Sequence, residues 1–380
     1  MTVYLDNAAT TRVREEAAAA ALSAMREDFG NPSSTHLPGR AAADILERAR
    51  ADVASVLGVG PESVAFTSGG TEANNWAVLR GAESRARAGR HVITSSAEHD
   101  SVRRSAEHLS KHGYDVTFLT PSPSGAVRLE DVASAMREDT ILISLMLVNN
   151  ETGAVNPIAE IAGEIKRRGF GALLHTDAVQ AYGKLPLSLS ALGADLVSVS
   201  AHKIYGAKGA GALIIRPGVR LPPLLLGGGQ ENERRAGTHA MPAVAAFGEA
   251  ARLAKAELPD NLARAEALKA LAIAEITARL PNAVVISPAD GSPYILSVSL
   301  PGHRGETLTN ALDAERIYVS RSSACKKGAR SHVLDAMRLP PNVIDGALRV
   351  SFSRETTADE VRLFAESLER VSKAVFTRRR

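Results

Sequence analysis

Several polar side chains of this 380-residue chain stand where short apolar stretches end, and two of them could do chemistry together. Lys203 follows the stretch LVSVS (196–200), and Asp177 follows ALLHT (172–176), with Gln180 a little further on. An ammonium removed from water loses its proton more easily, and the resulting amine forms a Schiff base with a carbonyl such as that of pyridoxal phosphate. A buried carboxylate in turn pairs with a protonated ring nitrogen. By themselves, Lys203 also fits a surface lysine and Asp177 a helix N-cap.

A glycine-rich turn, SGGT (68–71), follows another apolar stretch, SVAFT (63–67). Between a strand and a helix, free backbone N–H groups and the helix dipole attract a phosphate, which makes Gly70 and Thr71 candidates for a phosphate site. The turn has neither the lysine of a P-loop nor the spacing of a dinucleotide fingerprint, so it favours neither ATP nor NAD. An ordinary strand-to-helix turn with Thr71 near its cap is the alternative.

Two further side chains are suited to proton transfer and nucleophilic attack. His99 follows HVIT (91–94), where an imidazole could stack on a cofactor ring and move protons, or simply begin a helix. Cys325, the one cysteine of the chain, lies in SRSSACKKGARS beside Lys326 and Lys327. Neighbouring ammonium groups stabilise a thiolate, and buried structural cysteines usually lie in apolar segments. This context therefore favours an exposed, reactive thiol over a packing role.

The elements that must position these residues alternate between short β-like runs and longer helical stretches. The five β-like runs, each followed by a polar loop, are residues 63–67, 91–94, 141–148, 172–176 and 196–200. This alternation is typical of an α/β fold with a largely parallel sheet that is buried on both sides. Ligands of such sheets bind beyond the carboxyl ends of the strands, so we expect the polar loops to converge on one site.

The pattern changes after Leu258-Pro259. A long helix is predicted over about 260–280, and it is followed by strand-like PYILSVSLPG and a further helix. The chain then contains the strand-like segment 348–353 and a final amphipathic helix from about Thr357. That order indicates a smaller α+β domain, joined to the first by the long helix.

The composition excludes several classes of protein. Basic residues number 45 against 42 acidic ones, a net charge of +3, and aromatic residues make up 4%. A nucleic-acid binder concentrates basic residues and stacks bases on aromatic side chains, so this class is disfavoured. The longest apolar run, 141–148, is far shorter than the roughly 18 residues of a membrane helix, and the N-terminus shows no secretory signal. A single cysteine makes neither an internal disulfide nor a multi-cysteine metal site, so we expect a cytoplasmic protein without a metal.

A series of short motifs runs through the chain in a specific order. The motifs are YLDNAATT, GNPSSTH, FTSGGTEANN, AEHDSV, VNNETG, HTDAVQ, SAHKIYGAKGAGAL, GGGQE, RAGT, SSAC and LRVSFSRETT. Together they resemble the cysteine desulfurase family, pyridoxal-phosphate-dependent enzymes of the class V aminotransferase group. The resemblance implies a fold-type I PLP-dependent transferase, α/β in class, whose large domain has a mainly parallel seven-stranded sheet. It places the large PLP-binding domain at 13–258, and the small α+β domain with the catalytic cysteine loop at 1–12 and 259–380.

The resemblance also implies a role for each matching residue. Lys203 would bind pyridoxal 5'-phosphate covalently and move protons at Cα, Asp177 would keep the pyridine nitrogen protonated, and Gln180 would hydrogen-bond the phenolic oxygen. The phosphate would be bound by Gly70, Thr71, Ser200 and His202, and by Thr238 from a second subunit. His99 would stack on the ring and Asn150 would lie beside the cofactor, where both contact the reacting groups. Arg349 would clamp the substrate carboxylate, as suits a guanidinium, and Cys325 would attack the substrate sulfur.

The implied reaction takes sulfur from L-cysteine, releases L-alanine and leaves a persulfide on Cys325 for an acceptor protein, in a homodimer without membrane or nucleic-acid contact. The segment KKGAR after Cys325 looks shorter than in the housekeeping iron–sulfur members of the family, and the C-terminal extension of those members is absent. The acceptor is therefore left open between an iron–sulfur scaffold and other carriers. Two other interpretations stand. One is a selenocysteine lyase or another class V aminotransferase-like enzyme, for which Cys325 is dispensable, and the other is a catalytically inactive scaffold of a sulfur complex.

Overall fold

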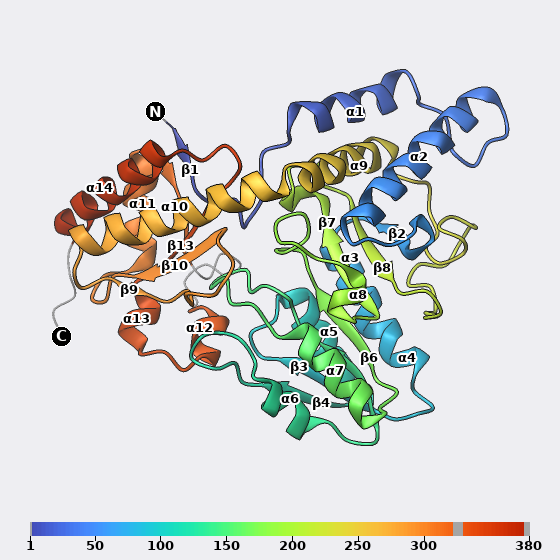
Figure 1. Ribbon diagram of the computed structural model, residues 1–380, viewed down its shortest axis with the longest axis horizontal. Helices are drawn as coiled ribbons and strands as arrows, with labels where there is room; N and C mark the ends of the chain where they lie inside the picture. The colour runs from blue at the N-terminus through green and yellow to red at the C-terminus, as the bar shows by residue number, and fades with distance from the viewer. Residues whose placement is uncertain (1, 322–329, 376–380) are drawn as a thin grey trace.

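The largest element of the structure is a seven-stranded sheet (Figure 1). The computed structural model describes residues 2–321 and 330–375. In chain order the strands are β2 (Val64–Thr67), β3 (His91–Ser95), β4 (Asp115–Leu119), β5 (Thr140–Ser144), β6 (Leu173–Asp177), β7 (Leu196–Ser200) and β8 (Gly211–Ile215). Across the sheet their order is β2-β8-β7-β6-β5-β3-β4, and of these seven strands β8 alone runs opposite to the other six. The predicted α/β class with a mainly parallel seven-stranded sheet is confirmed.

Helices cover both faces of this sheet, because its central strands are apolar on both sides. Ile143 of β5 points into one hydrophobic cluster, whereas its neighbour Leu142 points into another on the opposite face. The helices of the first face are α1 (Glu15–Arg26), α2 (Leu37–Val56), α6 (Leu129–Ala135), α7 (Ile158–Arg168), α8 (Leu189–Leu192) and α9 (Met241–Ala256). Those of the second face are α3 (Gly70–Asn75), α4 (Gly81–Ser84) and α5 (Asp100–Ser110). The carboxyl ends of the strands are thereby left for ligands.

The predicted strand 141–148 is wrong in its second half, because β5 ends at Ser144. The backbone N–H groups of Leu145 and Leu147 still donate to carbonyls of β6, at 3.1 and 2.9 Å, so the chain stays beside that strand. Asn149 then turns the chain, since its Oδ1 accepts two backbone N–H groups that follow it. The apolar run beyond Ser144 thus reflects burial next to β6 and not a longer strand.

A second, four-stranded antiparallel sheet is built from the C-terminal part of the chain (Figure 1). Its order is β12 (Ser320–Arg321), β13 (Ala347–Ser351), β10 (Ile295–Ser299) and β9 (Val284–Val285). The helices of this part are α10 (Leu258–Arg279), α11 (Gly305–Ala314), α12 (His332–Ala336), α13 (Pro341–Asp345) and α14 (Ala358–Ala374). The N-terminal β1 (Val3–Tyr4) joins it by pairing in parallel with β11 (Ile317–Tyr318). The division into domains 13–258, and 1–12 with 259–380, remains a prediction, and the two sheets lie on its two sides.

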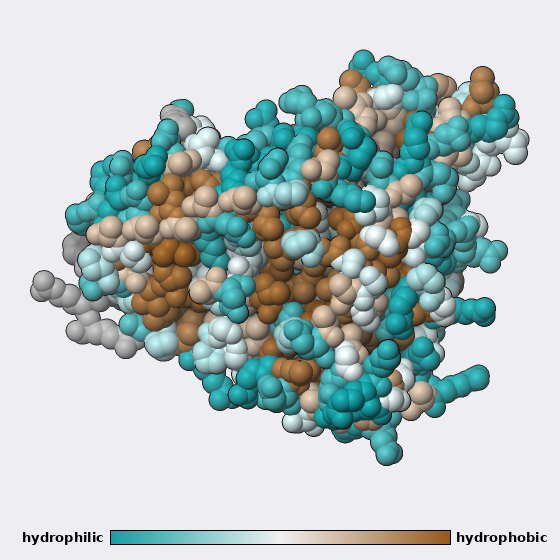
Figure 2. Space-filling model, in the orientation of Figure 1, coloured by the Kyte–Doolittle hydropathy of each residue, from teal (hydrophilic) through white to brown (hydrophobic). Residues whose placement is uncertain are grey.

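The long helix α10 continues from α9 along the molecule and packs on α14 through Leu268, Ala272 and Ile276. In the view of Figure 2, apolar residues gather beside α9 and α10 over the middle of the molecule, and hydrophilic residues lie toward its edges. None of the helices within 2–321 and 330–375 is long and apolar enough to cross a lipid bilayer.

The segment between β8 and α9 contains consecutive left-handed residues, Glu231–Glu233, with φ of 51°, 54° and 63°. Non-glycine residues in this conformation cost free energy, so their surroundings must hold them. The buried carboxylate of Glu231 accepts hydrogen bonds from both Nη atoms of Arg50, at 2.7 and 2.8 Å. It also accepts from Phe66 N and His239 Nε2, at 2.8 and 2.6 Å. Burial alone would raise the pKa of Glu231. The hydrogen bonds and the Arg50 charge outweigh burial and lower this pKa to about 2.

We expect Glu231→Ala to lower the free energy of unfolding by about 3–5 kcal/mol, because it leaves the buried Arg50 charge without its carboxylate. The matched control is Glu249→Ala, which removes a half-exposed pair with Arg252 and costs ~0–1 kcal/mol. Urea titration of both variants measures the difference. Since the folded-state pKa of Glu231 lies below its ordinary 4.5, this stabilisation is present above pH 4.5 and disappears as the pH falls through about 2. Equal losses in the two variants would contradict the assignment.

Candidate active site

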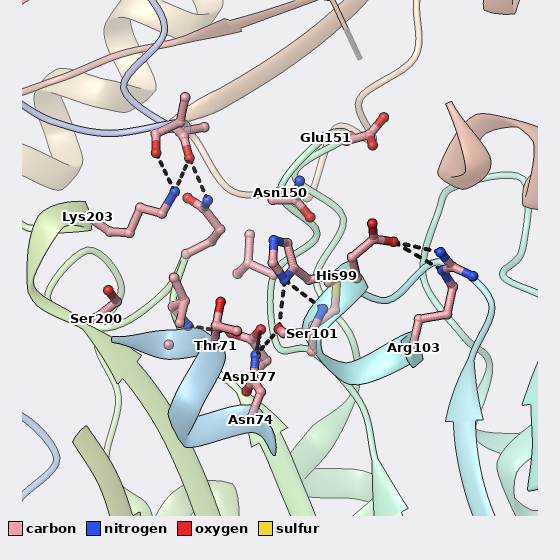
Figure 3. A pocket seen from close by; sticks show the side chains of 18 of the residues that line it. Thr71, Asn74, His99, Ser101, Arg103, Asn150, Glu151, Asp177, Ser200 and Lys203 are labelled. Atoms are coloured by element: carbon pink, nitrogen blue, oxygen red, sulfur yellow. Dashed lines mark hydrogen bonds and ion pairs between the residues drawn. The ribbon is translucent and has the colours of Figure 1, made fainter. Parts of the chain in front are cut away.

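A cavity of about 460 Å³ lies at the carboxyl ends of the central strands (Figure 3). Ten of the twelve predicted site residues line it, namely Gly70, Thr71, His99, Asn150, Asp177, Gln180, Ser200, His202, Lys203 and Arg349. Thr238 is not among the lining residues and is exposed on its own chain. Cys325 lies outside the described residues. The roles of all twelve remain predictions, but the polar loops do converge on one place, as the order of strands requires.

Asp177, the last residue of β6, is buried at the floor of the cavity (Figure 3). Its Oδ2 accepts a hydrogen bond from Asn74 Nδ2 at 2.7 Å, and its Oδ1 accepts from Val179 N at 2.9 Å. The Asx turn with Val179 replaces the helix N-cap that was the alternative prediction, because no helix begins here. Both donors stabilise the ionised carboxylate, which is the form that pairs with a protonated ring nitrogen.

His99 is joined to Asp177 by a chain of hydrogen bonds that crosses from α5 to α3. Asn74 Nδ2 donates to Ser101 Oγ at 2.9 Å as well as to Asp177. Ser101 in turn meets His99 Nδ1 through both its hydroxyl, at 2.7 Å, and its backbone N–H, at 3.2 Å. His99 Nδ1 therefore acts as the acceptor, which leaves the proton of a neutral imidazole on Nε2. His99 is also the N-cap of α5, so both interpretations of this residue hold at once.

Lys203 stands at the end of the short 3₁₀ turn that follows β7, and its ammonium reaches the N-terminal segment. Its Nζ donates to the carbonyl oxygens of Ala8 and Ala9, both at 2.7 Å (Figure 3). Gln180 Nε2 donates to the same Ala8 carbonyl at 2.9 Å. Two carbonyls of the turn at residues 7–9 thus hold the amine over the cavity, where an arriving carbonyl compound can meet it.

Another part of the cavity lining has groups suited to a phosphate. Gly70 opens α3, and a Cβ at this position would lie 2.8 Å from Val179 Cγ2 and 3.6 Å from Ser200 Cβ. Only backbone fits there, so its N–H can approach an anion. Burial, and then the charges of nearby lysines, lower the pKa of His202 to about 4, so its imidazole is neutral at pH 7. A neutral imidazole here donates one hydrogen bond without adding charge.

Arg349 enters the cavity from β13, an internal strand of the small sheet that pairs with β10 and β12. Its Nη1 donates to the carbonyl of Asn150 at 2.9 Å, and its Nη2 donates to Asp6 Oδ1 at 2.8 Å. Its Nε is buried and has no hydrogen-bond partner in the described chain. A buried donor without a partner costs free energy, so an incoming carboxylate finds an unfilled donor there.

Two buried glutamates beside the cavity were missed by sequence reasoning. Glu98 is completely buried and accepts from Met146 N at 2.9 and 3.1 Å, and burial raises its pKa well above the ordinary value. Glu151 accepts from Ser331 Oγ at 2.5 Å, and burial raises its pKa to about 7 although Ser331 and the Arg349 charge oppose that rise. Glu98 lies in the motif AEHDSV and Glu151 in NNETG. A single amino-acid sequence does not show that either glutamate is buried.

The groups left over around the cavity fit pyridoxal 5'-phosphate. Gln180 Oε1 and Ser200 Oγ are buried and lack a partner within the described ranges, whereas buried polar atoms normally have one. A hydroxyl and free backbone N–H groups suit the phosphate, the Asp177 carboxylate suits the ring nitrogen, and the Lys203 amine suits the aldehyde carbon. Among the described residues no group of three or more His, Cys, Asp or Glu side chains is arranged to hold a metal ion.

Comparisons with known proteins agree with this chemistry. The aminotransferase class-V family matches residues 3–364 of the chain. The chain is 39% identical over 372 residues to a protein of Dictyoglomus turgidum named cysteine desulfurase IscS, covering 97% of this chain and 94% of that one. It is 41% identical over 362 residues to a protein of the same name from Methanosarcina thermophila, covering 94% and 89%. A solved structure described as a NifS-like protein superposes with a TM-score of 0.93 at 38% identity, covering 99% of this chain and 100% of that one.

We expect Asp177→Asn to weaken cofactor binding about 10- to 100-fold, because a neutral amide loses the charge-assisted bond to a protonated ring nitrogen. Titration of the apoprotein with pyridoxal 5'-phosphate, followed by absorbance, measures this change. Asp195→Asn is the matched control. Asp195 is equally buried, but it accepts from Leu174 N and pairs with Arg216 away from the cavity. Its variant should bind the cofactor as the parent does, and a similar loss in both would mean that the effect is one of stability.

We expect Glu151→Gln to change how stability depends on pH. Between the ordinary pKa of 4.5 and about 7, the unfolded chain has released the Glu151 proton and the folded chain has not, so the parent loses stability as the pH rises through this window. Glutamine removes that loss while its amide oxygen still accepts from Ser331. Relative to the parent, the variant should therefore gain up to about 3 kcal/mol between pH 5 and pH 8. Thermal unfolding at both pH values measures it, and parallel curves would contradict a protonated Glu151.

Proposed function

Because the chain belongs to the aminotransferase class-V family, as a pyridoxal-phosphate-dependent cysteine desulfurase, we propose that its cavity takes sulfur from L-cysteine, releases L-alanine and leaves the sulfur on Cys325. One observation carries the proposal. A single cavity combines the amine of Lys203, the buried carboxylate of Asp177 and the buried guanidinium of Arg349. The guanidinium has one N–H donor, Nε, without a partner in the described chain. These groups are the ones that an amino acid and an electron-withdrawing cofactor require.

The cofactor, when bound, supplies a protonated pyridine ring that withdraws electrons from the amino acid's Cα. Asp177, whose geometry is fixed by Asn74 and Val179, would keep that ring nitrogen protonated. The Lys203 amine would hold the aldehyde carbon and move the proton at the substrate Cα. His99, whose Nδ1 accepts from Ser101 N, would lie against the ring and could pass a proton from Nε2.

The substrate carboxylate is bound by Arg349. The guanidinium is buried on β13, an internal strand of the small sheet, and the unpartnered Nε could donate to a carboxylate oxygen. The carbonyl of Asn150 accepts from Arg349 Nη1 and helps to fix the guanidinium. A carboxylate held by Arg349 would orient the amino acid relative to the Lys203 amine.

Cys325 is the proposed sulfur carrier. Its thiolate attacks the sulfur of the substrate, a new S–S bond forms, and the bond between that sulfur and Cβ breaks. The electron pair of the broken bond stays with the carbon side, Cβ takes a proton, and L-alanine leaves, so no outside oxidant or reductant is required. The lysines at 326 and 327 support the proposal, because ammonium groups favour the thiolate form.

Beyond the substrate, we infer sulfur transfer to an acceptor protein, either an iron–sulfur scaffold or another carrier, in the cytoplasm. We also infer a homodimer in which Thr238 completes the phosphate site of the partner. Thr238 is exposed and lies away from its own cavity, which supports a role in a second chain. Exposed apolar side chains, such as Phe29, Leu37 and Leu226 at 70%, 71% and 82% exposure, support a covering chain as well.

We expect Cys325→Ala to keep bound cofactor and to bind L-alanine as the parent does, but to release sulfide from L-cysteine at least about 100-fold more slowly, since no thiolate can accept the sulfur. Lys203→Ala should show the opposite pattern and fail to hold the cofactor covalently. Absorbance of the bound cofactor and a sulfide assay with reductant measure both properties. Full sulfide release by Cys325→Ala would instead favour a lyase that does not use the thiol. A parent protein that stays colourless after addition of pyridoxal phosphate would favour an inactive scaffold.

A further inference from the structure

The N-terminal segment 6–9 connects the small sheet to the cavity. Asp6 forms an isolated bridge with Ser351 of β13, and Ala8 N donates to Ser351 Oγ at 2.8 Å. Asn7 Nδ2 donates to the carbonyl of Ser351 at 2.9 Å. The segment is thus attached along the end of β13, two residues beyond Arg349.

Asp6 is the one carboxylate that contacts the Arg349 guanidinium within the described ranges. The distance from Arg349 Nη2 to Asp6 Oδ1 is 2.8 Å, and the side chains are 5% and 22% exposed. Together with the carbonyl of Asn150 on Nη1, Asp6 occupies two of the five N–H donors of the guanidinium. These two acceptors come from different parts of the chain, so the plane of the guanidinium is fixed from two sides.

An arginine side chain without such acceptors samples many rotamers, and ordering it costs free energy each time a ligand binds. An arginine that is already fixed binds a planar carboxylate without that cost. The carboxylate of Asp6 also opposes a bound substrate carboxylate electrostatically. However, the positive charge of Arg349 offsets the Asp6 charge, and part of Asp6 is in contact with water, which weakens the repulsion.

We propose that Asp6 is a positioning residue for the substrate, which orients Arg349 so that its unfilled donors face the α-carboxylate. The proposal rests on the proposed function, in which Arg349 binds that carboxylate. It adds that the preference for an amine with a carboxylate depends on the hydrogen bond between Arg349 and Asp6, and Asp6 is not among the residues that line the cavity. An amine without a carboxylate gains nothing from this arrangement.

The experiment compares L-alanine with ethylamine, which is the same amine without the carboxylate. Binding of each to the holoenzyme is followed by the absorbance of the bound cofactor. Asp6→Ala should weaken L-alanine binding about 10-fold and raise the KM for L-cysteine similarly, with kcat within about threefold, because a charge-assisted hydrogen bond is lost. Ethylamine binding should not change. Asp6→Asn should restore most of the L-alanine affinity, since its Oδ1 can still accept from Arg349 Nη2.

Asn7→Ala is the matched control for a structural role. Asn7 ties the same segment to the same strand, but it has no contact with Arg349. Its variant should lose thermal stability and keep the ratio of L-alanine to ethylamine affinity. A ratio altered equally in Asn7→Ala and Asp6→Ala would overturn the proposal, and so would unchanged or tighter L-alanine binding by Asp6→Ala.

Arg349→Ala separates this proposal from the proposed function. If Arg349 binds the carboxylate, Arg349→Ala weakens L-alanine binding strongly, and adding Asp6→Ala to it changes nothing further. Additive losses in the double variant would overturn the positioning role and leave the role of Arg349 intact. Unchanged L-alanine binding by Arg349→Ala would overturn the proposed function itself.

Discussion

The backbone of residues 6–9 is the constraint on which the rest of the site depends. This segment lies outside the large sheet, so its carbonyl groups need hydrogen-bond donors from elsewhere. Lys203 and Gln180 supply those donors at Ala8, while Ser351 of the small sheet holds the same residue through its N–H. A half-buried ammonium equally needs acceptors. The requirement is mutual, and it connects Lys203 and Arg349, the residues proposed to bind the cofactor and the substrate, through one segment although they come from different sheets.

Charge balance inside the cavity follows from burial. Among the residues that the structure describes, neither Glu98 nor Glu151 has a cationic partner at hydrogen-bond distance, and burial raises the pKa of both carboxyls and favours their neutral forms. Burial likewise lowers the pKa of His202 to about 4 and keeps its imidazole neutral. Arg349, in contrast, has a carboxylate partner, Asp6, at 2.8 Å. In the proposed function, this cavity would receive an anionic phosphate and a substrate carboxylate.

Sequence reasoning predicted the residues that follow strands, because strand ends of a parallel sheet meet at one edge. Lys203, Asp177 and Gln180 are of this kind, and their place could be argued from local pattern alone. Asp6 and Asn74 could not be predicted, since their partners Arg349 and Asp177 lie 343 and 103 residues away. The strand predicted over 141–148 was too long for a related reason. An apolar run indicates that a segment is buried, but its backbone pairing with a neighbouring strand determines whether the segment is a strand.

The two sheets carry different residues of the proposed site, so one sheet can change in sequence while the other is preserved. The residues proposed to bind the cofactor lie at the strand ends and loops of the large sheet, whereas Arg349, proposed to bind the substrate, lies on the small sheet. In the sequence, Cys325 also comes after a strand of that sheet, β12. The only described backbone that contacts Lys203, Gln180 and β13 together is the N-terminal segment. Changes in the small sheet that preserve Asp6, Ser351 and Arg349 can therefore alter how sulfur leaves without moving the groups that hold the cofactor.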